Sequence, residues 1–316
     1  MQINAGLPWH RRSAYWVLCG AVLVVSTSSI LIRFAQAEGV SAGAIAFWRL
    51  FIASLVLLLW VGAREPVGLG AAFRDRWLPL SGVFLGIHFA AWIASLFYTS
   101  VASSTALVTT IPVWVALASW LLFGERPTLR VALGIAAAMA GSACFFYAGE
   151  QPDSAGSNPT LGNMLAILGS WAVCGYMLIG RKRMQTHSTG AYVAAVYSVA
   201  AITLLVFALV SGDALWGYSA VAWWCLIGLA AGPQLLGHTG INWALARLTP
   251  TMVSVVILAE PVGSTVFAFL FLGEAIGLWQ IVGFVFLAVG IVTVSRAPAP
   301  LATPLTPKPT AEARRI

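Results

Sequence analysis

A few ionisable side chains stand inside long apolar stretches of this sequence, where water cannot solvate them. Arg49 lies within one such stretch, and Glu260 lies within another, directly before Pro261. A charge at the centre of a bilayer costs about 2.5–3.5 kcal/mol on insertion scales, so each should face protein or water and be paired. They could form a gate, hold a proton, contact a charge on a substrate, or make a structural ion pair. We assign both to gating or structure and leave these alternatives open.

His88, near the centre of another apolar stretch, adds a group that can bind a carboxylate or titrate near neutral pH. Trp92 follows one helical turn later, and Ser95 shares roughly the same helix face. An imidazole, a flat ring and a hydroxyl on one stripe could line a cavity for an amphipathic solute with a flat apolar end. Packing in the core or against lipid is the alternative for each.

Trp171, Gln234 and His238 complete the predicted substrate-binding residues. Gln234 follows Pro233 in an apolar stretch, and a buried amide needs a hydrogen-bond partner, which a polar cavity could supply. His238 lies in the same stretch, and Trp171 offers a flat ring from a different one. Ordinary hydrogen-bonded or packed core is again the alternative.

Two prolines, Pro112 and Pro261, stand near the middle of apolar stretches. Proline removes a backbone hydrogen bond and clashes with the preceding turn, so it breaks or kinks a helix. In transporters such breaks expose carbonyls to a central cavity and provide a bending point. We predict that both act as hinges, and a packed kink without movement is the alternative.

The sequence contains no arrangement typical of covalent, metal or nucleotide chemistry. GxSxG, HExxH, a Walker A loop and a GxGxxG after a strand are all missing. We therefore predict that the protein is not an enzyme, has no catalytic residues and binds no cofactor or metal. The cysteines form no CxxC pair and lie in apolar stretches, which is typical of buried hydrophobes: Cys19, Cys144, Cys174 and Cys225.

The composition indicates which solvent surrounds the protein. Of 316 residues, 60% are hydrophobic and 9% are charged, with a mean hydropathy of +0.89, whereas a soluble domain carries about 25% charged residues. A helix needs about 20 apolar residues to cross a bilayer, and backbone groups cannot stay unpaired in lipid, so helices are expected. We predict an all-α membrane protein with ten transmembrane helices, at about 13–35, 41–63, 77–99, 104–123, 128–148, 161–180, 190–210, 219–243, 251–272 and 277–295.

The basic residues predict the orientation of these helices. With a cytoplasmic N-terminus, all but Arg33 and Arg49 of the 17 Lys and Arg residues fall in cytoplasmic segments, as the positive-inside rule requires. Both termini are then cytoplasmic. The net charge of +7 thus serves topology, so we predict no nucleic-acid partner. We interpret the first stretch as a retained helix, because it is too long for a signal peptide and nine more follow.

An internal repeat divides the chain. Ile111-Pro112-Val113 with Gly124-Glu125 aligns with Glu260-Pro261-Val262 with Gly273-Glu274, at a constant offset of 149 positions (261 − 112). Since each half holds five helices, an odd number, the second must enter the membrane from the opposite side. Inverted repeats of this kind are typical of secondary transporters.

The predicted organisation has two repeats and three connecting or terminal segments. The segment after the second repeat is rich in proline, so we expect it to be disordered. The boundaries are a cytoplasmic N-terminus at 1–12, a first repeat at 13–148, an outer linker at 149–160, a second repeat at 161–295 and a cytoplasmic tail at 296–316.

These motifs, in this order and twice over, resemble the EamA family of the drug/metabolite transporter superfamily. Ala46-Phe47-Trp48-Arg49 adds to the two proline motifs, and the similarity covers about 13–295. The Phe- and Trp-rich helices and His88 resemble the bacterial aromatic amino acid exporter branch. The resemblance implies a multi-pass protein of the bacterial inner membrane.

We therefore expect a secondary transporter that exports amino acids, with aromatic ones favoured, by alternating access. A carrier of drugs or other metabolites would have the same fold, but Arg49 is the one deep basic residue, which argues against phosphates. An intramembrane enzyme or a scaffold is the alternative from another class. The expected partners are a small-molecule substrate and the lipid bilayer. The oligomeric state stays open, with a monomer favoured; Gly82 and Gly86 form a GxxxG that permits close helix contact but does not demonstrate a dimer.

Overall fold

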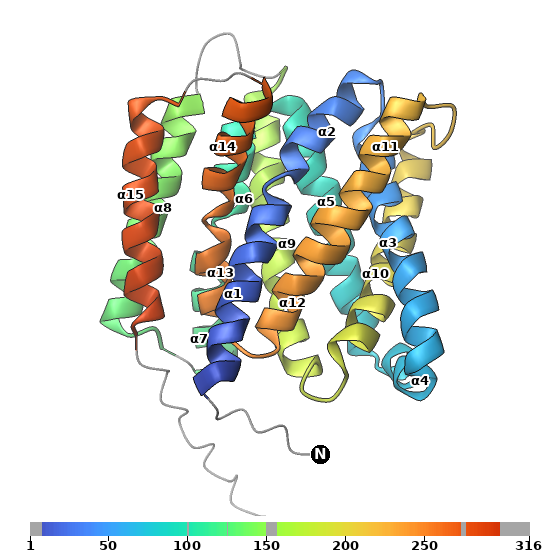
Figure 1. The fold of residues 1–316 in the computed structure, drawn as a ribbon, viewed down its shortest axis with the longest axis horizontal. Coiled ribbons are helices and arrows are strands. Elements are labelled where there is room, and N and C mark those ends of the chain that lie inside the picture. Colours follow the sequence, from blue (N-terminus) through green and yellow to red (C-terminus); the bar gives the residue numbers. More distant parts are fainter. Residues whose placement is uncertain (1–7, 100, 125, 150–156, 273–275, 298–316) are drawn as a thin grey trace, which may run out of the picture.

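The computed structural model describes residues 8–99, 101–124, 126–149, 157–272 and 276–297. Over these residues the chain is helical and contains no strand, as predicted (Figure 1). Most of the predicted linker and the predicted disordered tail lie outside the described residues, as do Glu125 and Glu274 of the repeated motif.

The helices follow the predicted apolar stretches. The first part of the chain forms α1 (Pro8–Val25), α2 (Ser28–Ala37), α3 (Ala42–Arg64), α4 (Pro66–Arg74), α5 (Trp77–Tyr98), α6 (Val101–Val108), α7 (Ile111–Phe123) and α8 (Leu129–Gly149). The second forms α9 (Pro159–Arg183), α10 (Thr189–Val210), α11 (Ala220–Leu229), the π-helix η2 (Ala230–His238), α12 (Thr239–Leu245), α13 (Pro250–Ile257), α14 (Glu260–Leu272) and α15 (Leu278–Ser295).

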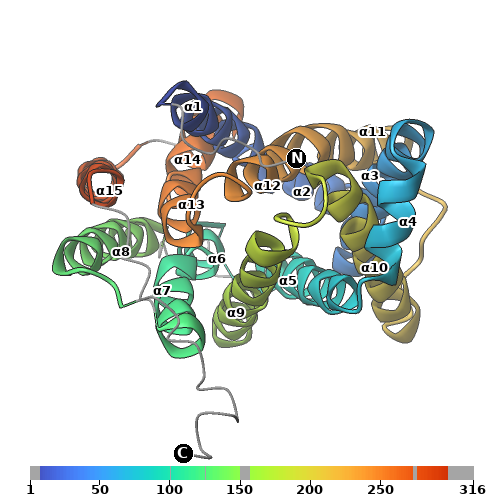
Figure 2. The ribbon, with the colours of Figure 1, turned by 90° about the horizontal axis from the view of Figure 1, so that it is seen from below.

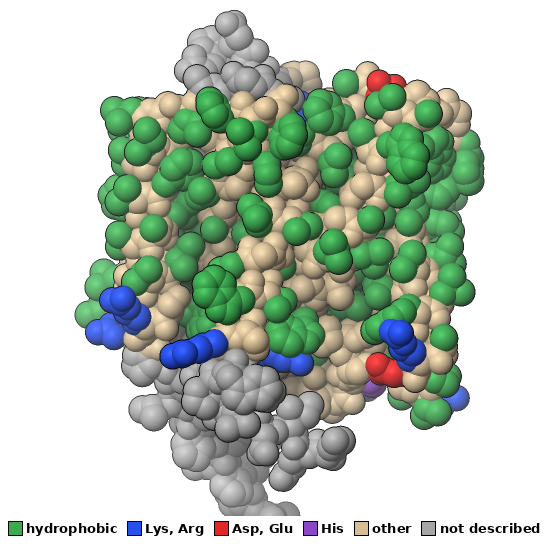
Figure 3. Space-filling view, in the orientation of Figure 1, with side chains coloured by type: hydrophobic (Ala, Val, Ile, Leu, Met, Phe, Trp, Pro, Cys, Tyr) green, Lys and Arg blue, Asp and Glu red, His purple; other side chains and the backbone are tan. Residues whose placement is uncertain are grey.

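Nine candidate spans, some built from two or three of these elements, are long and apolar enough to cross a membrane within the described part of the chain. A shorter apolar helix at Leu129–Cys144 lies in the predicted fifth stretch, so ten crossings remain a prediction. Figure 3 shows apolar side chains over the height of one face, with Lys and Arg gathered along its lower edge. We call this the N-terminal edge, because α1 begins there (Figure 1).

Side-chain caps set where several helices begin. The oxygens of Ser41, Ser188, Ser219 and Thr249 each accept a hydrogen bond from the backbone N–H three residues later. Such caps satisfy N–H groups that have no partner within the helix. At the other end of a helix, Gly124 has φ 69°, the left-handed conformation in which glycine ends helices without strain.

Three spans break near their middle. The breaks separate α1 from α2, α6 from α7, and α13 from α14 (Figure 1). Pro112 lies in the first turn of α7 and Pro261 in the first turn of α14, where the missing N–H costs little. The prolines thus stand immediately after breaks at matching places. Whether the breaks bend as hinges remains a prediction.

Glycines let α8 and α15 pack with their backbones in contact, at one end of the bundle (Figures 1 and 2). A Cβ added to Gly290 would lie 2.7 Å from the Ala138 nitrogen and the Gly134 oxygen. A Cβ added to Gly141 would lie 2.9 Å from the Gly283 oxygen. Small residues at such interfaces allow the close packing that holds membrane helices together.

A hydrogen-bonded cluster joins two loops at the N-terminal edge. Asp75 accepts hydrogen bonds from Arg183 Nη1 at 3.4 Å and, when that nitrogen carries the proton, from His187 Nε2 at 3.1 Å. Nearby, Ser188 Oγ donates to Glu65 Oε2 at 2.6 Å. Burial alone would raise the pKa of Asp75, but the Trp77 amide, His187 and Arg183 outweigh it, so this pKa lies below its usual value.

We expect Gly290→Ala to destabilise the protein by about 1–3 kcal/mol, because the backbone of α8 cannot give way to the added methyl group. The measurement is the midpoint of thermal unfolding in detergent. Gly20→Ala is the matched control, since Gly20 is an exposed helical glycine with nothing within 4 Å of an added Cβ. Equal midpoints for the two variants would contradict the close contact of α8 with α15.

Asp75→Asn should lower stability at pH 7 by about 0.5–1 kcal/mol, the usual range for a partly exposed pair. A carboxyl with a lowered folded pKa stabilises the fold above its unfolded pKa, and the effect fades as pH falls through the folded value. The difference between wild type and variant should therefore be full at pH 7 and shrink below about pH 4. Unfolding midpoints across this range test the prediction, and a difference that grows in acid would refute it.

Candidate functional site

Arg49 lies at the centre of a buried cluster that joins four elements. Its side chain, on α3, is fully buried. Nε donates to Gln234 Oε1 on η2 at 2.8 Å, and Nη1 reaches Ser28 Oγ on α2 at 3.5 Å. Nη2 has no hydrogen-bond partner within the described part of the chain. A guanidinium always carries its charge, so this cluster holds a fixed cation in an apolar bundle.

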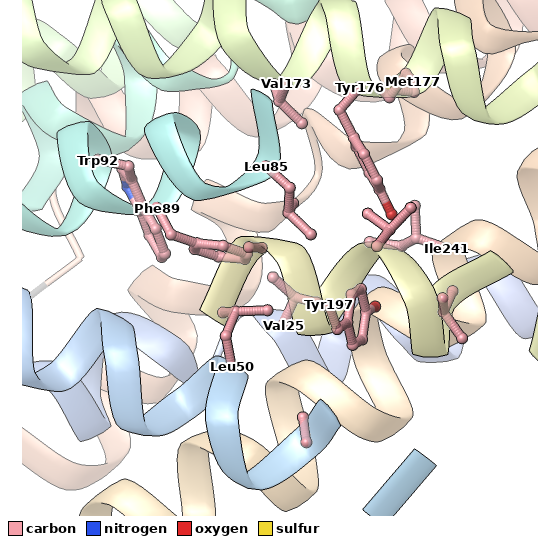
Figure 4. Packing of buried hydrophobic residues seen from close by; sticks show 14 of the residues in the cluster. Val25, Leu50, Leu85, Phe89, Trp92, Val173, Tyr176, Met177, Tyr197 and Ile241 are labelled. Carbon is pink, nitrogen blue, oxygen red and sulfur yellow. The ribbon is translucent and has the colours of Figure 1, made fainter. Parts of the chain in front are cut away.

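Aromatic rings of α5 cover the guanidinium. Its carbon lies 4.4 Å from the centre of the Phe89 ring and 5.9 Å from that of Trp92, distances at which the ring faces attract a cation. Figure 4 shows Trp92 and Phe89 together on α5, pointing toward the middle of the bundle. The indole Nε1–H of Trp92 is buried and finds no acceptor among the described residues.

Both predicted histidines belong to the same cluster. The His88 ring stacks on Trp92 at 6.2 Å with 9° between the planes, and its Nδ1 lies 2.9 Å from the Gly169 carbonyl oxygen on α9. His238, at the end of η2, meets Phe89 edge to face at 5.2 Å. Arg49, His88 and His238 therefore all contact the pair of aromatic rings formed by Phe89 and Trp92.

Gln234 and His238 stand four residues apart on η2, a spacing that places them on roughly one face of the helix. Pro233 provides no N–H, and over Ala230–His238 the backbone takes wider π turns. Gln234 is fully buried, and its backbone carbonyl accepts a hydrogen bond from Thr239 Oγ1 at 3.3 Å. Wider turns shift these side chains relative to a regular helix, which periodicity in the sequence cannot foresee.

Glu260 lies where α14 begins and is 8% exposed. Its charge interacts with that of Arg49, yet no ion pair within 4.0 Å joins the two among the described residues. The start of α14 contacts the break between α1 and α2: Ser26 Oγ donates to the Glu260 carbonyl oxygen at 3.1 Å, and Ser264 Oγ donates to the Ser26 carbonyl at 3.1 Å. A side chain on Gly263 would strike Ser26.

A buried polar chain continues from His238. The Asn242 amide donates to the His238 carbonyl at 2.8 Å, and its Oδ1 accepts from the Tyr176 hydroxyl at 2.6 Å. Tyr197, from α10, lies beside them, with its hydroxyl 3.5 Å from the Asn242 amide nitrogen. The sequence interpretation did not include Phe89, Tyr197 or Asn242. A polar residue within an apolar stretch was the available signal for Asn242, and Phe89 had none.

Two predicted residues lie in other surroundings. Ser95 is buried, donates to the Trp92 carbonyl at 2.6 Å and meets Ser104 of α6, so its visible contacts pack helices. Trp171 is 52% exposed and meets Trp114 edge to face at 5.2 Å. Together with Leu117, Leu121 and Cys174, these two tryptophans line an apolar groove of about 220 Å³ between α7 and α9.

The site thus brings together Arg49, His88, Trp92, Gln234 and His238 of the predicted residues, with Glu260 near them. It offers a fixed positive charge, unpartnered N–H donors and flat aromatic faces. Such a set can hold an acceptor-rich or anionic group next to an apolar one. Within the described residues no group of three or more His, Cys, Asp or Glu side chains is placed to hold a metal ion.

Comparisons with known proteins identify the family and the fold. The sequence model of the EamA-like transporter family matches residues 12–147 and again 160–296. An "Uncharacterized transporter" of Archaeoglobus fulgidus is 27% identical over 259 residues, which cover 79% of this chain and 84% of that protein. A solved crystal structure superposes with a TM-score of 0.73 at 18% identity, covering 90% of this chain and 96% of that one. At that identity the likeness shows the fold alone.

Proposed function

The chain belongs to the EamA-like transporter family and is a multi-pass membrane transporter, and we propose that it exports amino acids, aromatic ones preferentially, by alternating access. The observation that carries this proposal is the buried cluster around Arg49, in which a cation and unpartnered N–H groups adjoin the faces of Phe89 and Trp92. An aromatic amino acid has a carboxylate that can bind the cation and the N–H groups, and a flat apolar ring that can contact the two aromatic faces.

The proposed architecture is ten crossings in two inverted repeats, with both termini cytoplasmic in a bacterial inner membrane. Support comes from the packing, because α3 lies along α10, α7 along α13 and α8 along α15. Each of these contacts joins a predicted span of one repeat to the corresponding predicted span of the other, because α7 belongs to the span at 104–123 and α13 to the span at 251–272. The basic last turns of α3, α4 and α9 lie at the N-terminal edge, the side that the positive-inside rule assigns to the cytoplasm.

Contacts at both edges support alternating access as the mechanism. At the N-terminal edge, Asp75 contacts His187 and Glu65 accepts a hydrogen bond from Ser188, both in the loop before α10. At the opposite edge, Ser219 Oγ donates to Glu38 at 2.5 Å, and Trp48 Nε1 donates to the Leu215 carbonyl at 2.9 Å. Opening the centre to one side requires the contacts on that side to part. The breaks before Pro112 and Pro261 are the proposed bending points.

The substrate proposal rests on the charges in the site. A phosphorylated cargo would need several basic groups, and the one side chain here with a fixed positive charge is Arg49, while Glu260 would repel an anion. A cationic drug would be repelled by Arg49. Drugs and other metabolites carried by the same fold are the second candidate. The protein is proposed to act as a monomer in lipid, without nucleic acid, cofactor or metal.

We expect purified protein in liposomes to carry radiolabelled tryptophan and phenylalanine, with threonine slower, in a saturable manner. Excess unlabelled aromatic amino acid should compete, because all would share one central site. Running the assay with and without a pH gradient determines whether protons are coupled to the flux. Flux no greater than that of protein-free liposomes would reject amino acids as cargo and direct attention to drugs and other metabolites.

His88→Ala and Trp92→Ala should each reduce kcat/KM for the aromatic substrate by about tenfold or more, since each removes a ring from the site. The matched control is Trp224→Ala, because Trp224 is 73% exposed on α11 and should leave flux unchanged. Thermal unfolding midpoints establish that the variants are folded. Full activity in both His88→Ala and Trp92→Ala would remove the proposed site.

A further inference from the structure

Among the described residues, three buried N–H donors of the cluster find no acceptor, one of which is Gln234 Nε2. The other two, Arg49 Nη2 and Trp92 Nε1, are both without an acceptor in the described part of the chain, although their side chains lie in the buried core. Buried N–H groups without acceptors are unfavourable and rare in native proteins, so each one calls for an explanation. The two belong to neighbouring side chains, since the guanidinium lies 5.9 Å from the Trp92 ring centre. One acceptor-bearing group could therefore serve both.

The charge of Arg49 is also left without a direct counter-ion. Its two acceptors, Gln234 and Ser28, are neutral. The acid that interacts with it, Glu260, makes no contact with it within 4.0 Å among the described residues. A buried cation and a buried acidic side chain thus interact without forming a direct ion pair. A direct pair would have satisfied both, so the separation leaves each charge free for a partner of its own.

The other titratable groups that face the cluster indicate which part of the site suits a negatively charged group of a ligand and which part suits a positively charged one. His88 and His238 lie beside Arg49, and their electrostatic interaction with it is repulsive when they are protonated. The end near α5 and η2 is therefore the one that accepts an anion. Tyr197, from α10, adds a neutral hydroxyl nearby. Glu260, on α14, is the one acid of this set, so a cation belongs at its end.

We infer that the site recognises its substrate as a zwitterion, with the carboxylate bound by Arg49 and the Trp92 indole N–H and the ammonium bound by Glu260. This inference rests on the proposed function and deepens it, because it makes both free ends of an α-amino acid necessary. The ring faces of Phe89 and Trp92 then provide the apolar surface that a flat side chain can contact. An amine without a carboxylate would leave Arg49 without a partner. A carboxylic acid without an ammonium would leave Glu260 without one.

The test measures competition in proteoliposomes that contain the full-length protein. Labelled phenylalanine is the transported probe, replaced by the fastest amino acid if phenylalanine is slow. The competitors are unlabelled phenylalanine, phenylalaninamide, which lacks the carboxylate, and N-acetylphenylalanine, which lacks the ammonium. We expect each modified compound to inhibit at least about tenfold more weakly than phenylalanine, because each loses a charge-assisted hydrogen bond.

Variants assign each end to its side chain. Glu260→Gln should reduce discrimination against N-acetylphenylalanine and keep discrimination against phenylalaninamide. Arg49→Gln should reduce discrimination against phenylalaninamide and keep discrimination against N-acetylphenylalanine. If Arg49→Gln does not fold, Trp92→Phe serves instead, since it keeps a ring and removes the N–H, and it should lessen discrimination against the amide. Arg130→Gln is the matched control, because Arg130 is exposed at the N-terminal edge and should leave both ratios unchanged.

The outcomes separate the inference from the proposed function. Saturable amino acid flux that phenylalaninamide and N-acetylphenylalanine inhibit as well as phenylalanine would overturn the zwitterion site and leave amino acid export standing. The zwitterion site is likewise overturned if both modified compounds are discriminated against but the variants change neither ratio. Absence of saturable flux for every amino acid would reject the proposed function, and this site with it.

Discussion

The centre of this protein is organised by one constraint, the burial of a permanently charged guanidinium among apolar helices. Arg49 obtains hydrogen-bond acceptors from η2 and α2 and aromatic faces from α5. This side chain of α3 therefore connects elements from both halves of the sequence. Because these partners are neutral, the cation is solvated without being neutralised. The protein therefore has a positive charge at its centre that can bind an anionic group.

Around that centre the backbone must find partners without water. Where spans break, hydroxyls supply hydrogen bonds: Thr109 donates to the Thr105 carbonyl, Thr110 to the Leu107 carbonyl, and Ser264 to the Ser26 carbonyl. The breaks before α7 and α14 lie at matching places, whereas the break between α1 and α2 has no counterpart in the continuous helix α9. The middle of the protein is thus less symmetric than the repeated motif suggests, and Glu260 lies where α14 meets the broken span of α1 and α2.

The parts of the bundle are held together by contacts of different strength. Glycines bring the backbones of α8 and α15 together along their length, and nothing there can shift without losing packing. The contacts at the two edges are a few hydrogen bonds, each worth about 0.5–1.5 kcal/mol net. A movement that changes access to the centre is therefore expected to part the edges and to preserve the glycine-packed pair.

The sequence by itself determined the solvent, the helical class and the approximate ends of the spans, because composition, turn residues and prolines act locally. It also singled out Arg49, His88, Trp92, Gln234 and His238, since a polar or aromatic group at depth in lipid stands out, and the structure brings these residues into one cluster. It did not foresee that Trp171 faces outward or that Ser95 serves helix packing, and it missed Phe89, Tyr197 and Asn242. In nearly uniform apolar helices no periodicity reveals which face turns inward. Only tertiary packing decided that rotation, through glycine contacts, the π turns of η2 and the demand of a buried guanidinium for acceptors.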